Sequence, residues 1–418
     1  MFLPLLQISS SSAVLVAIAL IIIIGYISSA IFRRTRVPEL LILMLIGIFL
    51  VHVVNVVPIN YLDVMRSLAP VFSSLALVVI MFNGSKELKL GDTALRSLKG
   101  ITLGLLDTII SMAVVSLVMH YIFGWPLLYG VILGTILGET ASIVVIPFIR
   151  KVKLSPDIFG TLFAETTINS VGVIAIFSLL LILAGNQVVS AFSFTTYVLD
   201  YLSFAIVMGL IAGAGWLFLA NTLKNAREYI ATLAVAILLY GFVDIFNGAA
   251  IISVMIFGIV IGNEQVITEL ARFNARDRKD NDNKAVKVQT SVMGDQVSEK
   301  AVEKELEFLI STFFFVFMGM LTVLSKQYLF YGIMISVLLI IARYAEIRAV
   351  LYKNTQDERS LAFALMPRGV TVATLATILY GLGGAYFMQV FYISFIVIVV
   401  TSIISSLMLN RVSVEVKK

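Results

Sequence analysis

Charged and polar side chains inside long apolar segments are the features of this sequence that could do chemistry. The run AETTINSVG at 164–172 lies in the middle of an apolar stretch and places Glu165 four residues before Asn169, and Thr166 four residues before Ser170. Residues four apart on a helix share a face, so these side chains lie on adjoining stripes of one face. Such a face either holds neighbouring helices together through polar contacts or lines a path for an ion or another solute.

A second polar interruption occurs in the preceding apolar segment, in GETASIVVIP at 138–147. Gly138, Thr140 and Ser142 are poor helix formers, and Pro147 cannot donate a backbone hydrogen bond. Interrupted backbone at membrane depth is tolerated only where it lines a cavity or is buried in protein. The acidic residue of this stretch, Glu139, is therefore a candidate for a site inside the protein.

A third segment, MPRGVTVATLAT at 366–377, repeats the pattern of proline, glycine and small hydroxyl residues and adds the charge of Arg368. A charge at the centre of a bilayer costs several kcal/mol, so it is found mainly where it faces a cavity or a partner. The other charges expected at membrane depth are Asp107, Arg343 and Glu346. For Asp107, function and a structural role as a buried acid bonded to hydroxyl groups are equal alternatives.

The composition places these residues in a membrane. Hydrophobic residues make up 60% of the 418 residues and charged residues 13%, whereas a soluble domain carries roughly 25% charged residues. The chain has no cysteine and only two histidines, which argues against thiolate or histidine metal sites. No nucleotide-binding motif occurs, so we expect a transporter without ATP chemistry, with no cofactor and no nucleic-acid partner, and not an enzyme.

Apolar segments of about the length that spans a bilayer, roughly 20 residues, recur along the whole chain. We predict an all-α polytopic membrane protein, embedded in lipid, with thirteen spans at 10–31, 38–57, 66–83, 98–122, 127–149, 157–184, 198–220, 228–246, 248–264, 305–324, 327–350, 359–382 and 387–410. Lysine and arginine concentrate in alternate loops, which indicates an external N-terminus and a cytoplasmic C-terminus, as expected for a plasma-membrane protein.

The two interrupted segments are spans five and twelve, so six-span units formed by spans one to six and eight to thirteen have opposite orientations in the membrane. Paired interrupted helices in inverted repeats indicate a secondary transporter with its site at the midplane. The predicted organisation is a transmembrane domain at 1–410, with repeats at about 10–184 and 228–410, a linker helix at about 198–220, a cytoplasmic loop at 265–304 and a tail at 411–418. The mixed-charge loop is either a tether between the halves or a regulatory or partner-binding segment, with helix resuming around 298–306.

Five short motifs occur in a fixed order along these spans: RVPELLILMLIGIFL at 36–50, IMFNGSKELKL at 80–90, STFFFVFMGML at 311–321, IARY at 341–344 and PRGV at 367–370. In this order they resemble the cation:proton antiporter superfamily, and in particular its NhaP-like sodium/proton antiporters. The resemblance implies a scaffold domain beside a transporting core in which broken fifth and twelfth helices cross next to the sixth. It also implies a homodimer.

The resemblance further implies an ion-binding carboxylate on the sixth helix, within an Asn-Asp or Asp-Asp pair. In this sequence the pair falls on Asn169 and Ser170, so the acid is absent from its usual position. The glutamate common on the family's third helix corresponds to Asn83, and the family's fifth-helix Thr-Asp pattern becomes Thr140 and Ala141. The ion site is therefore atypical.

Because these acids are missing, we hypothesise that Glu139 has taken over the exchange of cation and proton. The neutral oxygen ligands for the monovalent cation, Na⁺ or K⁺, would come from Thr140, Asn169 and Ser170. The resemblance suggests that Glu165 forms a structural ion pair with Arg343. Two alternatives stay open: Glu139 is the structural partner of Arg368, or Glu139 and Glu165 exchange roles.

The function expected from these residues is exchange of a monovalent cation for protons by alternating access. Two other functions remain as alternatives. One is a transporter of the same fold for a different solute or an anion, because the loss of acids makes the cavity less negative. The other is a transport-inactive membrane sensor or interaction protein, in which the loop at 265–304 is the working part.

Overall fold

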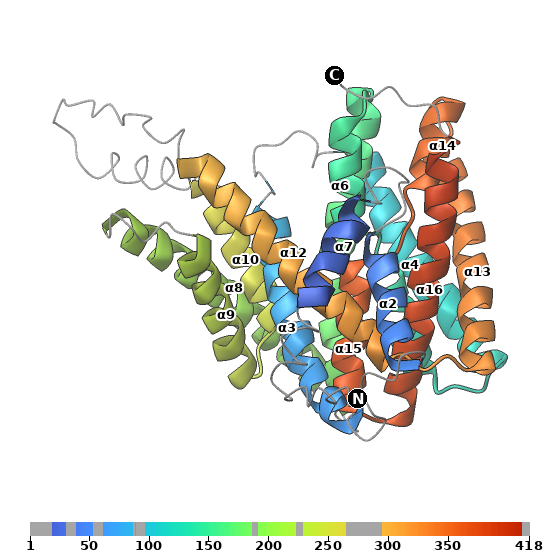
Figure 1. Ribbon diagram of the computed structural model, residues 1–418, viewed down its shortest axis with the longest axis horizontal. Coiled ribbons are helices and arrows are strands. Elements are labelled where there is room, and N and C mark those ends of the chain that lie inside the picture. Colours follow the sequence, from blue (N-terminus) through green and yellow to red (C-terminus); the bar gives the residue numbers. More distant parts are fainter. Residues whose placement is uncertain are drawn as a thin grey trace, which may run out of the picture.

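The computed structural model describes residues 19–30, 39–52, 62–86, 88, 97–185, 191–222, 229–264 and 295–411. These residues form helices and the links between them, and the helices run roughly side by side through the molecule (Figure 1). Residues 1–18, 265–294 and 412–418 fall outside the described part, and with them the start of the first predicted span, most of the predicted loop and nearly all of the tail.

Every predicted span overlaps a helix or a pair of short helices, so the prediction of an all-α polytopic membrane protein is confirmed. The helices are Ala19–Ala30, α2 (Glu39–His52), α3 (Leu62–Lys86), α4 (Leu98–Tyr121), α5 (Leu127–Leu137), α6 (Ser142–Lys151), α7 (Pro156–Gly185), α8 (Ala191–Thr222), α9 (Tyr229–Ile245), α10 (Ala250–Gly262), α12 (Asp295–Leu321), α13 (Lys326–Val350), α14 (Gln356–Ala364), α15 (Val370–Leu382) and α16 (Ala385–Leu409). Helices α4, α7, α13 and α16 and long stretches of α3 and α8 are each apolar and long enough to cross a bilayer.

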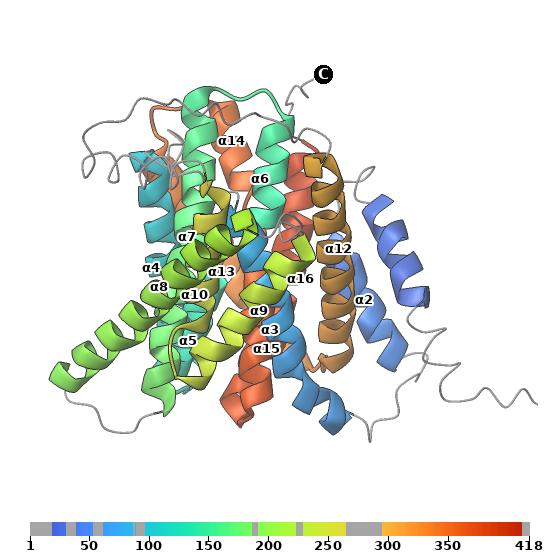
Figure 2. The same ribbon diagram turned by 90° about the vertical axis from the view of Figure 1, so that its left-hand side faces the viewer.

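The two interrupted segments of the sequence are two broken helices in the structure. The first halves are α5 and α14, and the second halves are α6 and α15. Figure 2 places α6 and α14 toward one end of the molecule and α5 and α15 toward the other, so the chain passes through the two broken helices in opposite directions. The first break lies at residues 138–141, before Pro147, which is inside α6. Glycine and small residues, rather than the proline, therefore mark this interruption.

The two breaks touch each other at the centre of the molecule. The backbone N–H of Ala141, in the first break, donates a hydrogen bond to the carbonyl oxygen of Pro367, in the second, at 2.9 Å. Gly369 packs against Ala141 so closely that a Cβ at position 369 would lie 2.4 Å from the Cβ of Ala141. The contact therefore requires a glycine there, which gives the PRGV motif a steric reason. This crossing leaves backbone groups and polar side chains available at the same depth.

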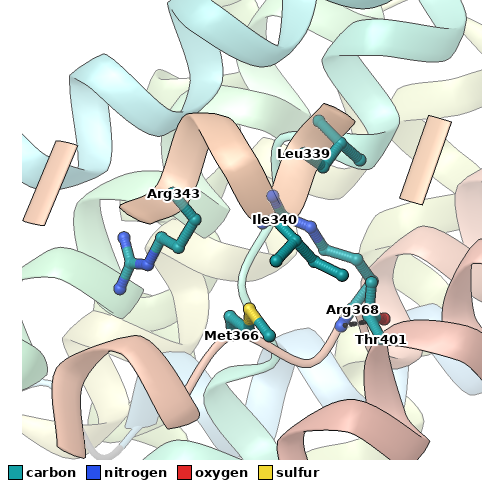
Figure 3. Close-up of a pocket in the computed structure, with 6 residues that line it drawn as sticks. All are labelled: Leu339, Ile340, Arg343, Met366, Arg368 and Thr401. Carbon is teal, nitrogen blue, oxygen red and sulfur yellow. Dashed lines mark hydrogen bonds between the residues drawn. The ribbon is translucent and has the colours of Figure 1, made fainter. Parts of the chain in front are cut away.

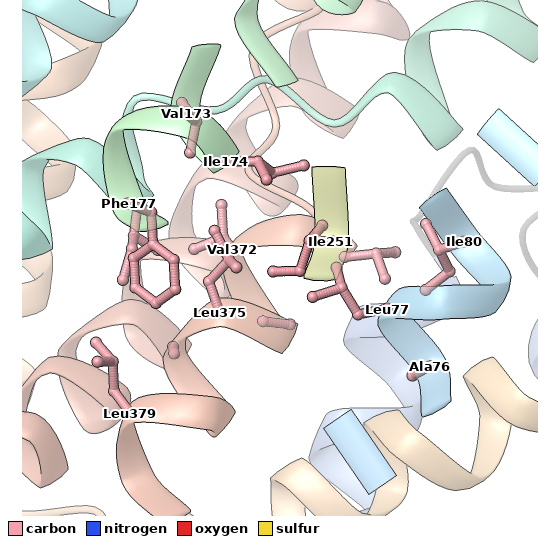
Figure 4. Close-up of a cluster of buried hydrophobic side chains, with 14 of the residues drawn as sticks. Ala76, Leu77, Ile80, Val173, Ile174, Phe177, Ile251, Val372, Leu375 and Leu379 are labelled. Atoms are coloured by element: carbon pink, nitrogen blue, oxygen red, sulfur yellow. The ribbon is translucent and has the colours of Figure 1, made fainter. Parts of the chain in front are cut away.

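The broken helices belong to a set of packed helices that we call the site group: α4, α5, α6, α7, α13, α14, α15 and α16. The remaining helices, which we call the flanking group, are Ala19–Ala30, α2, α3, α8, α9, α10 and α12. They pack mainly among themselves: α12 contacts α2 and α3, and α3 also contacts α10. The two groups meet where α15 and α7 face α3 and α10. Apolar side chains fill this boundary, among them Leu77 of α3, Phe177 of α7, Ile251 of α10 and Leu375 of α15 (Figure 4).

Candidate ion-exchange site

An ion pair joins α4 to the break between α14 and α15. The Arg368 guanidinium donates two hydrogen bonds to the Asp107 carboxylate, from Nη1 to Oδ2 at 2.8 Å and from Nη2 to Oδ1 at 3.0 Å. Both side chains are buried, with only 2% exposed. This two-pronged geometry is the strongest arrangement available to an arginine and a carboxylate. Asp107 also accepts hydrogen bonds from Thr140 and Ser111, so its charge is fully compensated.

A second buried ion pair joins α7 to α13. Nη1 of Arg343 lies 2.5 Å from Oε1 of Glu165, and both side chains are 1% exposed. Nη2 of Arg343 also donates to the carbonyl oxygen of Ala362, in α14, at 3.3 Å. The pairing suggested by the family resemblance is thus present in the geometry, and Glu165 is committed to an arginine.

Glu139 is a buried carboxylate outside both ion pairs. It lies in the break between α5 and α6 and is 1% exposed. Oε1 accepts a hydrogen bond from the Ser170 hydroxyl at 3.0 Å, while Oε2 has no hydrogen-bond partner among the described residues. Arg368 donates to the backbone carbonyl of Glu139 at 3.1 Å, and its ion-pair partner is Asp107. The alternative in which the Glu139 carboxylate pairs with Arg368 is therefore wrong in this structure, because the Arg368 guanidinium is paired with the Asp107 carboxylate.

Asn169 fastens α7 to the break in the fifth span. Its Oδ1 accepts the backbone N–H of Thr140 at 2.9 Å, and its Nδ2 donates to the carbonyl oxygen of Gly138 at 2.7 Å. Nδ2 also lies 3.2 Å from the Gly104 carbonyl oxygen and 3.2 Å from the Thr108 hydroxyl, both on α4. The amide thus satisfies the backbone groups that the broken helix exposes, which a buried break requires.

The structure brings the four predicted cation ligands together where α7 meets the first break, but their hydrogen-bond partners differ. These ligands are Glu139, Thr140, Asn169 and Ser170. The Thr140 hydroxyl donates to Asp107 at 3.0 Å and is itself approached by Arg368 at 3.4 Å. The Asn169 oxygen accepts the Thr140 N–H, whereas Oε2 of Glu139 accepts no hydrogen bond from the described residues, so the Glu139 carboxylate has the most acceptor capacity left.

Asn83 lies in a different part of the structure. Its Nδ2 donates to Glu307 of α12 at 3.1 Å, and its Oδ1 accepts from the Tyr229 hydroxyl at 3.1 Å. All three residues belong to the flanking group. The sequence-based suggestion that Asn83 contributes to the ion site receives no support from this geometry, because the side chain is already bonded to α9 and α12.

A small pocket beside the two arginines is lined by Leu339, Ile340, Arg343, Met366, Arg368 and Thr401. It is too narrow to hold a water molecule. In Figure 3 the guanidinium groups of Arg343 and Arg368 lie apart from each other. Arg343 pairs with Glu165, and Arg368 pairs with Asp107.

The pairing of Asp107 with Arg368 was missed from the sequence. Asp107 stood out as an acid at membrane depth, but nothing along the chain links it to a residue 261 positions away. The sequence also did not predict that Asn169 bonds the first break to α7 and α4. The backbone groups that a helix break leaves without partners can be identified only once the break is located.

Comparison with known proteins gives relatives of one kind. The chain is 26% identical over 255 residues to the probable Na(+)/H(+) antiporter 2 of Methanocaldococcus jannaschii, across 57% of this chain and 58% of that protein. It is 23% identical over 266 residues to the K(+)/H(+) antiporter NhaP2 of Shewanella oneidensis, across 62% of this chain and 45% of that protein. The chain thus matches about half the length of these curated relatives.

The fold is shared over nearly the full chain. The structure of the sodium proton antiporter MjNhaP1 from Methanocaldococcus jannaschii at pH 8 superimposes with a TM-score of 0.72 at 20% identity, covering 95% of this chain and 97% of the other. A family model described as sodium/hydrogen exchanger, transmembrane, matches residues 16–415. With crossing broken helices and buried ion pairs inside that match, this chain belongs to the sodium/hydrogen exchanger family.

Proposed function

We propose that this protein exchanges a monovalent cation for protons, and that the exchanging group is the carboxylate of Glu139. The observation that carries the proposal is the position of this side chain. It is buried at the crossing of the two broken helices, it lies outside both ion pairs, and one of its oxygens has no hydrogen-bond partner among the described residues. The names of the relatives, which include Na⁺/H⁺ and K⁺/H⁺ antiporters, agree with this chemistry.

The charge balance of the site explains why the Glu139 carboxylate must bind either a proton or a cation. Arg368 compensates Asp107, and Arg343 compensates Glu165. An ionised Glu139 would be an uncompensated charge in a region of low dielectric, which is strongly unfavourable. Glu139 is therefore neutral when it carries a proton, or charged with a bound cation. Because the same oxygens hold either ion, occupancy by one excludes the other, and the two fluxes are coupled by competition.

The cation would be held by oxygen atoms around Glu139. The Ser170 hydroxyl can turn so that its oxygen, instead of its proton, faces the carboxylate-bound ion. Thr140 and Asn169 position Glu139 and Ser170, since they bond the break to α4 and α7. The substrate class is a monovalent cation such as Na⁺ or K⁺, and one exchanging carboxylate favours electroneutral one-for-one exchange.

Alternating access requires the site group to move relative to the flanking group. The boundary of α15 and α7 with α3 and α10 is lined with apolar side chains (Figure 4), and apolar contacts are non-directional. A sliding or rocking movement there breaks few hydrogen bonds. We place the protein in the plasma membrane as a homodimer, with its C-terminus in the cytoplasm, following the distribution of lysine and arginine and the family resemblance.

The test is transport by the purified full-length protein in lipid vesicles that contain a pH-sensitive dye. Na⁺, K⁺ or Li⁺ is added outside, and proton movement is followed for wild type and Glu139→Gln. The glutamine keeps the size of the side chain but binds neither a proton nor a cation, so we expect cation-driven proton movement to disappear. Glu139→Asp, which retains the acid on a shorter side chain, should keep part of it.

A matched control removes an acid from the flanking group. Asp244, on α9, is exposed, and Asp244→Asn should transport like wild type. Exchange that survives in Glu139→Gln would move the role to another carboxylate. Absence of exchange in folded wild-type protein with every cation would reject the exchanger itself and favour a different solute or a sensor.

A further inference from the structure

Glu346 is a fourth buried carboxylate, and neither the family match nor the proposed exchange site uses it. It lies on α13, three residues after Arg343, and is 2% exposed. Neither of its oxygens has a hydrogen-bond partner among the described residues. The buried face of α13 is otherwise built from small and apolar residues, apart from Ser336 and Arg343. An acid here costs stability unless it is neutral or compensated.

Among the described residues, Arg343 is the positive group within 4 Å of Glu346, and it is already paired with another acid. Oε2 of Glu346 lies 3.9 Å from Nη1 of Arg343, which is too long for a hydrogen bond. The same Nη1 is 2.5 Å from Glu165. One arginine therefore faces two carboxylates, and it cannot compensate both. Two like charges that share a single partner do not both ionise at neutral pH, and one of them takes up a proton.

The charged groups around Glu346 come from several helices. Besides Arg343, these are Asp107 of α4, Glu165 of α7 and Arg368 from the break before α15. The buried faces of the adjacent helices α14 and α16 carry no charged residue. Since Arg368 is held by Asp107 with two hydrogen bonds, it offers Glu346 no contact, and Arg343 remains the group for which Glu346 competes.

We propose that Glu346 is a second proton-binding site, distinct from Glu139, and that its proton determines which carboxylate holds Arg343. With the proton bound, Glu346 is neutral and Arg343 stays with Glu165. When the proton leaves, the new negative charge draws the guanidinium away from Glu165. The required movement is short, because the same nitrogen of Arg343 lies within 4 Å of both acids.

This exchange of partners reaches the cation site through α7. Glu165 lies one turn before Asn169 and Ser170 on that helix, so its bond to Arg343 fixes α7 against α13. Glu346 is also about one turn from the end of α13 at Val350, at the end of the molecule where α14 lies (Figure 1), so we expect its proton to exchange with that side. The proton on Glu346 thus reports the pH of that side to the exchange site. This consequence for transport rests on the proposed function, whereas proton binding by Glu346 does not.

Infrared difference spectroscopy tests the proton directly. Full-length wild type, Glu346→Gln and Glu139→Gln are reconstituted in lipid without Na⁺ or K⁺, and spectra are compared between acidic and alkaline pH. A protonated carboxylic acid has its own carbonyl stretch, which disappears when the proton leaves. We expect the wild-type difference spectrum to contain a band from each of these two acids, and each variant to lack one of them, a different one in each case.

The two proposals fail separately in this experiment. If the band change persists unaltered in Glu346→Gln, Glu346 holds no titrating proton and the inference is wrong, whatever Glu139 does. If it persists unaltered in Glu139→Gln, the exchange site is wrong and Glu346 is unaffected. Glu346→Asp, which restores an acid at this position, should restore a band and guards against a folding defect in the glutamine variant.

A second measurement tests the competition for Arg343. In Glu165→Gln the arginine has lost its close partner, and an ionised Glu346 can replace it. The double variant Glu165→Gln with Glu346→Gln leaves Arg343 with no adjacent carboxylate. We therefore expect the loss of thermal stability in the double variant to exceed the sum of the losses in the two single variants. Additive losses would show that Glu346 is no alternative partner and would overturn the switch.

Discussion

Arg368 and Asp107 meet through two parallel hydrogen bonds at 2.8 and 3.0 Å, although they lie on segments of the chain that are 261 residues apart. The same guanidinium reaches the backbone carbonyl of Glu139 at 3.1 Å. One side chain thus connects α4, the end of α5 and the break before α15. Because the carbonyl lies at the C-terminal end of a helix, the positive charge is also favourably placed against the helix dipole. The pair holds the crossing together and leaves the side chain of Glu139 outside the ion pair.

Removal of either partner of this pair should be strongly destabilising. Asp107→Asn or Arg368→Gln leaves one buried charge uncompensated, which costs about 3–5 kcal/mol. Arg368→Lys should also lose stability, because an ammonium group cannot make two parallel hydrogen bonds. Thermal unfolding of the purified variants in detergent measures these losses. Because the double variant leaves no isolated charge, its loss should be smaller than the sum of the single losses, and strictly additive losses would contradict the pairing.

Ser170→Ala should weaken cation binding without abolishing exchange. The variant removes the hydroxyl that lies 3.0 Å from Glu139 but keeps the carboxylate that carries the charge. A hydrogen bond to a buried group contributes about 1 kcal/mol, so we expect the apparent KM for the cation to rise about fivefold. Transport rates at several cation concentrations in vesicles give this value. A loss of maximal rate with an unchanged KM would show that Ser170 does not touch the cation.

Asn169→Ala should disrupt the break itself. The variant leaves the N–H of Thr140 and the carbonyl of Gly138 buried without their partner. Each unsatisfied group costs about 1–3 kcal/mol, so both stability and exchange should fall. Thr167→Ala is the matched control, since Thr167 is buried on the same helix and its hydroxyl has no hydrogen-bond partner among the described residues. Equal losses of stability and exchange in the two variants would show that the hydrogen bonds of Asn169 do not hold the break in place.

Glu358 gives the expected dependence of stability on pH at the membrane surface. It lies in the first turn of α14, where Thr355 and Glu358 form a capping box, and it also accepts hydrogen bonds from Ser155 and Asn354. Partial burial acts to raise the pKa of Glu358, but the hydrogen bonds from Ser155, Asn354 and Thr355 outweigh it and hold the pKa below its usual value. An acid with a lowered pKa stabilises the fold when ionised, so this contribution is present near neutral pH and is lost as the pH falls through the pKa.

Glu358→Gln should therefore unfold at a lower temperature than wild type near neutral pH, and the difference should shrink as the pH is lowered. Thermal unfolding of both proteins over a pH series measures this. Asp357→Asn is the control, because Asp357 is an exposed acid in the same turn with no part in the capping box. If the difference in unfolding temperature between wild type and Glu358→Gln stays constant with pH, ionisation of Glu358 does not stabilise the first turn of α14.

The sequence by itself determined the class of the protein, the helices and the places where two of them break. Long apolar runs leave the backbone no alternative to helix in a bilayer, and glycine and small residues at 138–141 mark the first break, which lies before Pro147. Local composition carries this information because hydrophobicity and helix propensity act over a few consecutive residues.

Only the tertiary structure decided which acid each arginine holds. The described part of the chain holds four buried carboxylates and two buried arginines, and their positions in the sequence do not reveal which of them pair. Arg343 could have paired with Glu346, its neighbour on α13, but lies closest to Glu165 of α7, and Arg368 binds Asp107 rather than the side chain of Glu139. These choices depend on how α4, α7, α13 and the crossing breaks pack, since the attraction between buried charges is decided by distances of a few ångströms.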